Sequence, residues 1–335
     1  MTAADTVAAL LWLSLTAYAV LAGADFGGGV WDLFARGWRA AEQRRAVAEA
    51  MGPVWEANHV WLIFMITGLF TAFPTAFGAV ALAFYLPFTI AMTGIVLRGA
   101  AFAFRAHGRV AVGAQSPWGI VFGVASLITP FFLGSAAAAA ASGSVRLRNG
   151  SLISGFESGW TAPYSLLIGA FAVSLCSYLA ATYLAVETEG SDLQYDFRAR
   201  ALVAGLASGM LGLLALALAP LLAPTLAHAL FGRGLPLLVV ALLNGPLALF
   251  AVWRARPALA RVAVAAQVVF VLWAWALGQW PYLVPPDLTI VGSAAPEATL
   301  EALLVVTAAG MLLLLPSLWL LFKIFKARNP AAVRQ

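Results

Sequence analysis

Charged residues are scarce in this chain of 335 residues. Asp, Glu, Lys and Arg together make up 10% of it, whereas apolar residues make up 63% and the mean hydropathy is +0.92. Soluble domains carry roughly 25% charged residues, so the composition excludes that class. The apolar runs of about 20 residues are long enough to cross a bilayer as helices. They lack the alternation of membrane-spanning strands, and we therefore predict an all-α, polytopic membrane protein.

Cysteine and early basic residues are also nearly absent. Cys176 is the only cysteine, so the chain forms no internal disulfide. Its place inside an apolar run favours a small core residue over a redox group. No basic residue precedes Arg36, so the first apolar run lacks the basic region of a signal peptide and is expected to remain as a span. The net charge of +5 does not indicate nucleic acid, because the basic residues sit in short loops between apolar runs.

The three histidines limit the metal chemistry. Glu56 and His59 form a Glu-x-x-His, which is half of the di-iron motif of helix bundles, but neither His107 nor His228 supplies the second half. We therefore expect no metal site. One axial histidine suffices for a haem, so a haem on His59 remains an alternative. A hydrogen-bonding or proton-relay role for this histidine is the favoured interpretation.

We predict nine spans in a single membrane domain that covers residues 1–335. The expected spans are 6–34, 53–73, 78–104, 117–141, 162–186, 199–222, 235–253, 259–280 and 299–325. Alternate loops differ in basic residues: one set holds 15 of the 19 Lys and Arg, the other holds three, and Arg98 lies inside a span. Because basic loops stay in the cytoplasm, we expect the N-terminus outside and the C-terminus inside.

A glycine pattern and a charged segment give two further predictions. Gly23 and Gly27 form a G-x-x-x-G pattern, which favours close packing of a neighbouring helix. Residues 186–200, VETEGSDLQYDFRAR, mix charges of both signs, and we expect a solvated loop between the fifth and sixth spans.

The stretch from Met51 to Trp61, MGPVWEANHVW, places polar groups at the start of an apolar segment. Glu56, Asn58 and His59 are its polar members. An ionisable group at the centre of a membrane helix costs on the order of 2.5 to 3.5 kcal/mol on insertion scales, so it marks a candidate functional site. Glu56 and His59 are three positions apart and therefore share a helix face.

A second carboxylate is expected at the same depth. Asp25 precedes Arg36 by eleven residues, and Glu56 follows Arg45 by eleven residues. At 1.5 Å per helical residue, each carboxylate lies roughly 16 Å from its basic anchor, near the middle of the membrane. We therefore expect both carboxylates in one layer, on adjacent antiparallel helices.

Arg98 completes this set, and two interpretations of it stay open. Arg98 lies seven residues before Arg105, and its long side chain can reach the layer of Asp25. One interpretation is a structural ion pair that locks the first three spans together. The other is a proton route from the cytoplasm. Asp32, two turns from Asp25, is either its entrance or a surface partner of Arg36.

Five blocks of sequence resemble subunit II of cytochrome bd-type quinol oxidases, in order from the first span to the last. They are GADFGGGVWDL, GPVWEANHVWL, FYLPF with VLRGAAFAFR, ATYLAVETEG with LQYDFRARA, and DLTI with TLEALL and LPSLWLLFKIF. The block WEANHVWL is the most specific, because it is similar to the family's Trp-Asp-Gly-Asn-x-x-Trp-Leu.

The resemblance implies an accessory subunit of a respiratory terminal oxidase in the bacterial inner membrane. Subunit I of such an oxidase carries the b and d haems, oxidises quinol and reduces dioxygen to water. Subunit II has two four-helix bundles plus a peripheral helix, holds no haem, stabilises subunit I and contributes acidic residues to proton supply. In some members it carries a structural quinone, and a small single-span subunit can join the complex.

The resemblance also assigns residues. Asp25 matches the second acid of the family's Asp-Gly-Phe-Asp-x-Gly, Glu56 matches the Asp of the Trp-Asp block, and Arg98 matches the arginine of the Phe-Arg block. This chain departs from the family's motifs at two positions. Ala22 stands where Asp-Gly-Phe-Asp-x-Gly has its first acid, and Ala57 stands where the Trp-Asp block has the glycine after its acid. A carboxylate with one more methylene is kept at the second block, which suggests a divergent branch whose electron donor could differ.

The function predicted from the sequence is therefore an accessory oxidase subunit with a proton-transfer site. The proton-transferring residues are Asp25, Glu56, Asp32 and His59, with Arg98 and Asn58 as electrostatic and hydrogen-bonding partners. A stand-alone proton-coupled transporter is an alternative, although no clear inverted repeat is present. A structural scaffold with an inert ion-pair cluster is the other alternative.

Overall fold

The computed structural model describes residues 2–51, 55–107, 116–148, 151–154 and 159–327. Its helices are α1 (Ala3–Leu33), α2 (Ala40–Met51), α3 (Trp55–Ala72), α4 (Pro74–Ala83), α5 (Tyr85–His107), α6 (Pro117–Ser142), α7 (Pro163–Glu187), α8 (Asp192–Leu222), α9 (Pro224–Phe231), α10 (Leu235–Trp253), α11 (Pro257–Gln279) and α12 (Glu297–Ala327). Two short hairpins, β1 (Leu147–Arg148) with β2 (Ser151–Leu152) and β3 (Tyr282–Val284) with β4 (Leu288–Thr289), precede the 3₁₀ turn Val291–Ser293.

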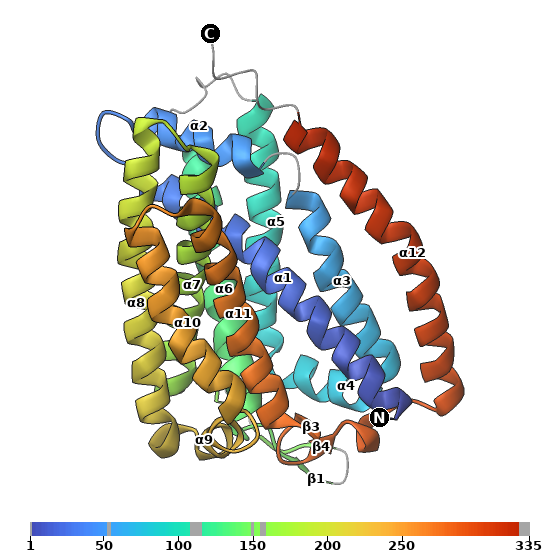
Figure 1. Cartoon of the computed structure of the whole chain (residues 1–335). Coiled ribbons are helices and arrows are strands. Elements are labelled where there is room, and N and C mark those ends of the chain that lie inside the picture. Colours follow the sequence, from blue (N-terminus) through green and yellow to red (C-terminus); the bar gives the residue numbers. More distant parts are fainter. Residues whose placement is uncertain (1, 52–54, 108–115, 149–150, 155–158, 328–335) are drawn as a thin grey trace.

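The long helices stand side by side (Figure 1), and their contacts divide all but α12 into two groups of four. In the first group, α1 packs against α3 and α6, and α5 packs against α6. In the second group, α7 packs against α8 and α11, and α10 packs against α8 and α11. Contacts of α7 with α1 and α6 join the two groups. The peripheral helix α12 packs on α1 and α3, and only 6% of its most apolar 18-residue stretch is buried. The predicted all-α bundle architecture is confirmed.

Within the described residues, eight helices are long and apolar enough to cross a membrane, and the number is nine when the bent pair α3 and α4 is counted as one span. The chain's first helix begins at the end of the molecule that carries α4 and the hairpins, and α12 finishes at the end that carries α2 (Figure 1). We call these the α4 end and the α2 end. Helix α1 therefore begins, and α12 finishes, at opposite ends of the bundle, in keeping with the predicted odd number of spans.

The break between α3 and α4 is set by a proline. Pro74 has no backbone N–H and restricts the residue before it, so Phe73 leaves the helical conformation and the chain bends by 119°. Helix α4 then lies across the end of the first group, where its alanines pack with Trp160 and Ile290 in one apolar cluster. Residues 78–83, which we expected at the start of the third span, therefore belong to α4, and α5 begins only at Tyr85.

The glycines of α1 permit close helix approach, as the G-x-x-x-G pattern predicts. A Cβ built on Gly27 would lie 1.9 Å from the carbonyl oxygen of Cys176 on α7. A Cβ on Gly29 would lie 2.1 Å from the hydroxyl of Ser126 on α6. Helix α1 therefore contacts both neighbours almost backbone to backbone, and the polar side chains that it carries are buried between them.

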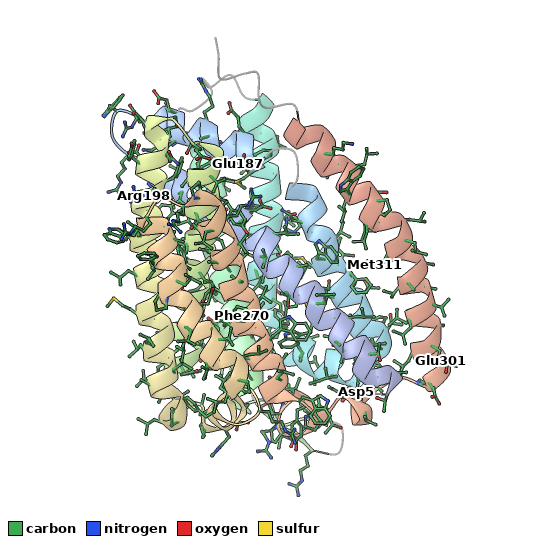
Figure 2. The ribbon with its side chains drawn as sticks, viewed as in Figure 1. Asp5, Glu187, Arg198, Phe270, Glu301 and Met311 are labelled. Carbon is green, nitrogen blue, oxygen red and sulfur yellow. The ribbon has the colours of Figure 1, made fainter. Side chains whose placement is uncertain are left out.

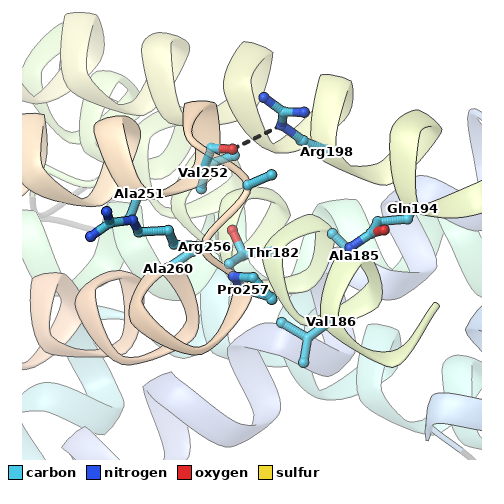
Figure 3. A pocket seen from close by; sticks show the side chains of 11 residues that line it. Thr182, Ala185, Val186, Gln194, Arg198, Ala251, Val252, Arg256, Pro257 and Ala260 are labelled. Carbon is cyan, nitrogen blue, oxygen red and sulfur yellow. Dashed lines mark hydrogen bonds between the residues drawn. The ribbon is translucent and has the colours of Figure 1, made fainter. Parts of the chain in front are cut away.

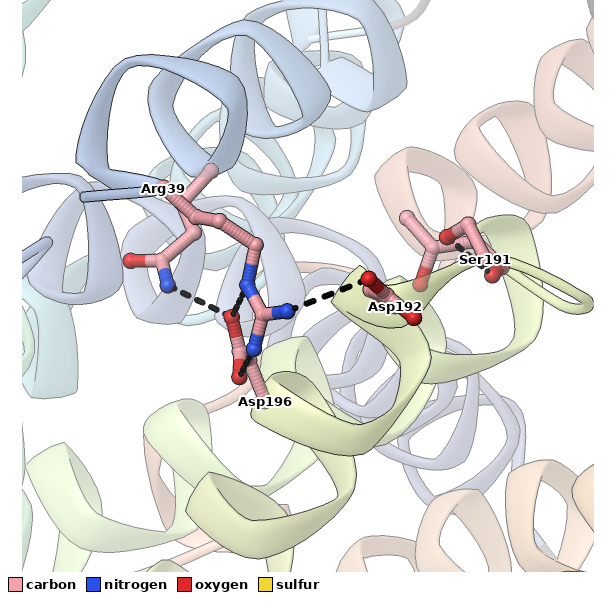
Figure 4. A network of polar contacts seen from close by, with 6 residues as sticks. Arg39, Ser191, Asp192 and Asp196 are labelled. Atoms are coloured by element: carbon pink, nitrogen blue, oxygen red, sulfur yellow. Dashed lines mark hydrogen bonds and ion pairs between the residues drawn. The ribbon is translucent and has the colours of Figure 1, made fainter. Parts of the chain in front are cut away.

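Helix α2 is an element that we did not predict. Its buried residues, Gln43, Val47 and Met51, recur every fourth position, whereas its other positions are polar or alanine. A guanidinium clamp fixes its start to α8: Arg39 donates to both oxygens of Asp196, at 2.9 and 2.5 Å, and lies 3.4 Å from Asp192 (Figure 4). Gln43 donates to the same carboxylate at 2.9 Å.

The clamp also corrects the expected loop over residues 186–200. Helix α7 continues to Glu187 and α8 begins at Asp192, so only four residues connect them. Most of the mixed charges therefore lie on helix, where Asp196 faces α2 and Arg200 donates to the side-chain oxygen of Gln43 at 2.6 Å.

Candidate functional site

The charged residues of α1 and α5 form two layers. Asp25 and Asp32 are seven residues apart on α1, and Arg98 and Arg105 are seven residues apart on α5. Both helices run from the α4 end toward the α2 end (Figure 1). Seven residues make two helical turns, so each pair lies on one face and the two spacings match. One layer therefore contains Asp25 and Arg98, and the other contains Asp32 and Arg105.

The outer layer is a direct ion pair. Arg105 donates from its two terminal nitrogens to the two oxygens of Asp32, each at 3.0 Å. Asp32 is only 1% exposed, and the side chain of Arg105 is 16% exposed. This two-pronged, charge-assisted contact is geometrically specific. The alternative surface pairing of Asp32 with Arg36 is therefore wrong, because Arg105 holds both oxygens.

The inner layer is arranged differently. Asp25 is 6% exposed and lies eight residues before the end of α1, which corresponds to about 12 Å of helix. One of its oxygens accepts a 2.5 Å hydrogen bond from the side-chain amide of Asn58 on α3. Asp25 and Arg98 are both described, and they form no direct salt bridge. The predicted contact of the carboxylate with Arg98 is therefore replaced by an amide.

Arg98 is held by other groups. It is 2% exposed, and its Nε donates to the hydroxyl of Ser126 on α6 at 3.1 Å. Its guanidinium lies 5.0 Å from the ring centre of Phe26 and 5.2 Å from that of Phe122. Aromatic faces attract a cation that has lost its water.

The remaining predicted residues lie on α3. His59 is half-buried, and its ring centre lies 6.0 Å from that of Tyr18, a buried residue of α1. Glu56 belongs to the first turn of α3, but its side chain lies outside the described residues. The structure thus brings Asp25, Asn58 and His59 to the interface of α1 and α3, and it places Asp32 in a separate ion pair.

A cavity of about 120 Å³ adjoins Asp25 and Asn58, and its walls come from α1, α2, α3, α7 and α11. Pockets for small molecules and cofactors are roughly 300 to 1,000 Å³, so a porphyrin does not fit here. His59 does not line this cavity. Within the described part of the chain, no three His, Cys, Asp or Glu side chains gather as metal ligands.

A smaller cavity of about 30 Å³ lies between α7, α8, α10 and α11 at the α2 end (Figure 3). Arg198 borders it and donates from Nε to the carbonyl oxygen of Val252 at 2.9 Å. This carbonyl lies in the last turn of α10 and also accepts from the backbone N–H of Ala255 at 3.1 Å, so Arg198 adds a second donor. The arrangement is a helix cap, and the space holds one water molecule at most.

Two functional contacts were not predicted from the sequence. We counted Arg105 among the loop residues, and we did not consider Ser126. The equal seven-residue spacings on α1 and α5 were a usable signal for Arg105, because matched layers on parallel helices produce matched pairs. Nothing in the sequence marks Ser126, whose role depends on how α6 packs.

The fold and the site define a class: a polytopic helical membrane protein with buried charges between its first helices. The model of the family Cytochrome bd terminal oxidase subunit II matches residues 3–325, and the chain belongs to that family. A chain in the structure of bd oxidase from Geobacillus thermodenitrificans superimposes with a TM-score of 0.80 at 25% identity, over 98% of this chain and 100% of that chain.

Two curated relatives are similar over shorter stretches. Cytochrome bd ubiquinol oxidase subunit 2 of Bacillus subtilis is 36% identical over 37% of this chain. Cytochrome bd-I ubiquinol oxidase subunit 2 of Escherichia coli is 29% identical over 59% of this chain. The matches span 37% and 52% of those two relatives' lengths.

Proposed function

We propose that this chain is the accessory subunit of a bd-type respiratory terminal oxidase, in which it stabilises the haem-bearing subunit I and supplies protons from the cytoplasm. Membership of the family supports the assembly role. The main support for the proton role is the environment of Asp25, whose buried carboxylate accepts a hydrogen bond from Asn58 and lines a cavity.

The chemistry of the complex requires such a supply. Haems in subunit I take electrons from quinol and pass them to dioxygen. Each electron delivered to dioxygen consumes one proton when water forms, and the haem site lies in a membrane that excludes ions. A carboxylate partway across the membrane meets this need, because it accepts and releases a proton without a large movement.

The polar residues at and near the inner layer then have distinct roles. Asp25 carries the proton. Asn58 orients the carboxylate through one oxygen. Arg98 lies in the same layer but donates to Ser126, so it does not occupy the carboxylate oxygens of Asp25. We assign the next transfer to Glu56 and His59 on α3.

Asp32 is less suited to this work. To accept a proton it must break the two-pronged contact with Arg105 and leave a largely buried cation without its partner. This observation favours a structural role for the outer layer. The inert ion pair of the scaffold alternative then applies to Asp32 and Arg105 only. The transporter alternative loses its basis, because the family match extends over residues 3–325.

The test is Asp25→Asn in the complex, co-expressed and purified with the haem-bearing subunit. Asn keeps the volume and hydrogen bonding but cannot ionise, so we expect normal assembly, a normal haem spectrum and slow oxygen consumption. Glu301→Gln, which changes an exposed acid on α12 near the α4 end (Figure 2), is the matched control and keeps the normal rate. An Asp25→Asn complex with the wild-type rate would leave an inert scaffold as the function of this layer.

A further inference from the structure

The cavity next to Asp25 connects a buried wall with an exposed one. Asp25 and Asn58 form the buried wall and are 6% and 3% exposed. Glu187 and Arg261 line the cavity from the ends of α7 and α11, and their side chains are 44% and 40% exposed. Figure 2 shows Glu187 at the α2 end of the bundle. The cavity therefore leads from the surface at the α2 end to the inner-layer carboxylate.

The size and lining of the cavity suit water. A volume of about 120 Å³ exceeds the roughly 30 Å³ that one water occupies in the liquid. An ordered water needs two to four polar partners, and the cavity offers a carboxylate at each wall, an amide and the phenol of Tyr183. Much of the other lining is small, including Ala24 and Gly28, so the space is not filled by side chains.

The ion pair at the exposed wall is loose. The nearest nitrogen of Arg261 lies 3.8 Å from a carboxylate oxygen of Glu187, which is longer than a hydrogen bond. Arg261 also lies over the ring of Tyr183, 5.1 Å from its centre. The carboxylate of Glu187 is thus open to solvent, with 44% of its side chain exposed, whereas Asp32 is 1% exposed and both of its oxygens contact Arg105.

On the basis of the proposed proton-supply function, we propose that Glu187 is the proton-intake group of this chain and that water in the cavity relays protons from it to Asp25. A proton from bulk water forms an O–H bond on Glu187. It moves along the waters as O–H bonds form and break in turn, and it ends as an O–H bond on Asp25. Glu187 returns to its ionised form, and no electrons move.

The cavity lies between the two groups of helices. Its inner wall comes from α1 and α3, in the first group of helices, and its outer wall comes from α7 and α11, in the second group. The route therefore runs along the junction of the two groups. It does not pass through the Asp32 layer, which we considered from the sequence as the entrance.

The first experiment compares acid substitutions in the purified complex. Glu187→Gln is expected to slow oxygen consumption several-fold while haem content and haem reduction by quinol stay normal. Glu187→Asp, which keeps an acid, is expected to restore most of the rate. Glu189→Gln changes an exposed acid two residues away that does not line the cavity, and it keeps the normal rate.

Arg261→Gln separates proton intake from a structural ion pair. It removes the same pair as Glu187→Gln but leaves the acid, so its rate is expected to stay well above that of Glu187→Gln. Equal losses in the two variants would overturn the proposal, because the ion pair alone would then explain them.

The second experiment fills the cavity without changing any charge. Ala24→Leu adds volume next to Asp25 and is expected to slow turnover while the haem spectrum is kept, whereas Ala308→Leu on the exposed face of α12 keeps the rate. Failure of this proposal can be told apart from failure of the proposed function. If Asp25→Asn slows oxygen consumption but Glu187→Gln does not, Glu187 is not the intake group and the proposal is wrong. If both variants consume oxygen at the normal rate, this cavity does not supply protons and the proposed function fails as well.

Discussion

Asp25 and Asp32 are chemically identical residues two turns apart on α1, yet their partners give them different roles. Asp32 is held at both oxygens by a guanidinium, and Asp25 is held at one oxygen by an amide. We therefore predict that Asp32→Asn lowers the yield of the assembled complex. It leaves the largely buried charge of Arg105 without its counter-ion, at a cost of roughly 3 to 5 kcal/mol. Yield and thermal stability of the complex are the measurements.

A double variant is the control for this prediction. Asp32→Leu with Arg105→Met replaces the ion pair by apolar groups and is expected to recover much of the yield, because an apolar replacement removes the unpaired charge. Recovered yield with normal turnover would confirm that the pair is structural. An Asp32→Asn complex that assembles normally but turns over slowly would return Asp32 to the proton route.

Glu56 gives the second prediction at the residue scale. Glu56 lies two residues before Asn58 and three before His59 on α3, and it matches the acid of the family's Trp-Asp block; both points support a role in transfer beyond Asp25. Glu56→Gln cannot ionise, and we expect an assembled complex with its haem spectrum intact and slower oxygen consumption. Glu56→Asp should keep most of the activity, since an aspartate occupies this position in the family's motif. A Glu56→Gln complex with the normal rate across the pH range contradicts the assignment.

The sequence supports only part of the residue-scale picture. Burial depth follows from helix rise, so Asp25 and Arg98 could be placed in one layer by counting residues. Direct contact depends on how α6 and α3 pack. Counting residues cannot show that Arg98 donates to Ser126 or that Asn58 donates to Asp25. This is why an ion pair of Asp25 with Arg98 was predicted, whereas in the structure each of the two residues binds a different partner.

At the scale of elements, α1 is positioned by its glycines, and this gives the third prediction. A Cβ on Gly27 meets the backbone of α7 at 1.9 Å, and backbone cannot rotate aside as a side chain can. Gly27→Ala is therefore expected to push α1 and α7 apart and to lower assembly, with overpacking costs of roughly 1 to 3 kcal/mol. Gly209→Ala and Gly310→Ala are matched controls in other helices, where nothing lies within 4 Å of the new methyl. Equal yields of all three variants would contradict this account.

Long apolar helices could be predicted from the sequence, whereas α2 and α4 could not be separated from their surroundings. Helix α2 is short and mostly polar, and its buried face consists of Gln43, Val47 and Met51 alone. Helix α4 is as apolar as the spans on either side of it, so hydropathy merged its second half with α5. The bend at Pro74 was the available signal, because a proline restricts the residue that precedes it.

At the scale of the whole molecule, the two groups of helices meet along α1, α6 and α7. The proposed intake lies on this junction, so one surface serves both packing and proton supply. Gly27 on α1 lets α7 approach closely beside the cavity, and the small side chain of Ala24 lines the cavity. Closer packing at this junction would stabilise the bundle and close the route.

The orientation of the bundle in the membrane is the last prediction. Arg198, one of the basic residues predicted to face the cytoplasm, and Glu187 lie toward the α2 end, whereas Asp5 and Glu301 mark the α4 end (Figure 2). Fifteen basic residues against three place the α2 end in the cytoplasm, since basic loops are retained there. The proposed intake then opens to the cytoplasm. A reporter enzyme that is active only in the cytoplasm should be active when fused after Gln335 and inactive when fused before Met1. The reverse pattern would place Glu187 on the outer side, and cytoplasmic proton supply through this cavity would then be ruled out.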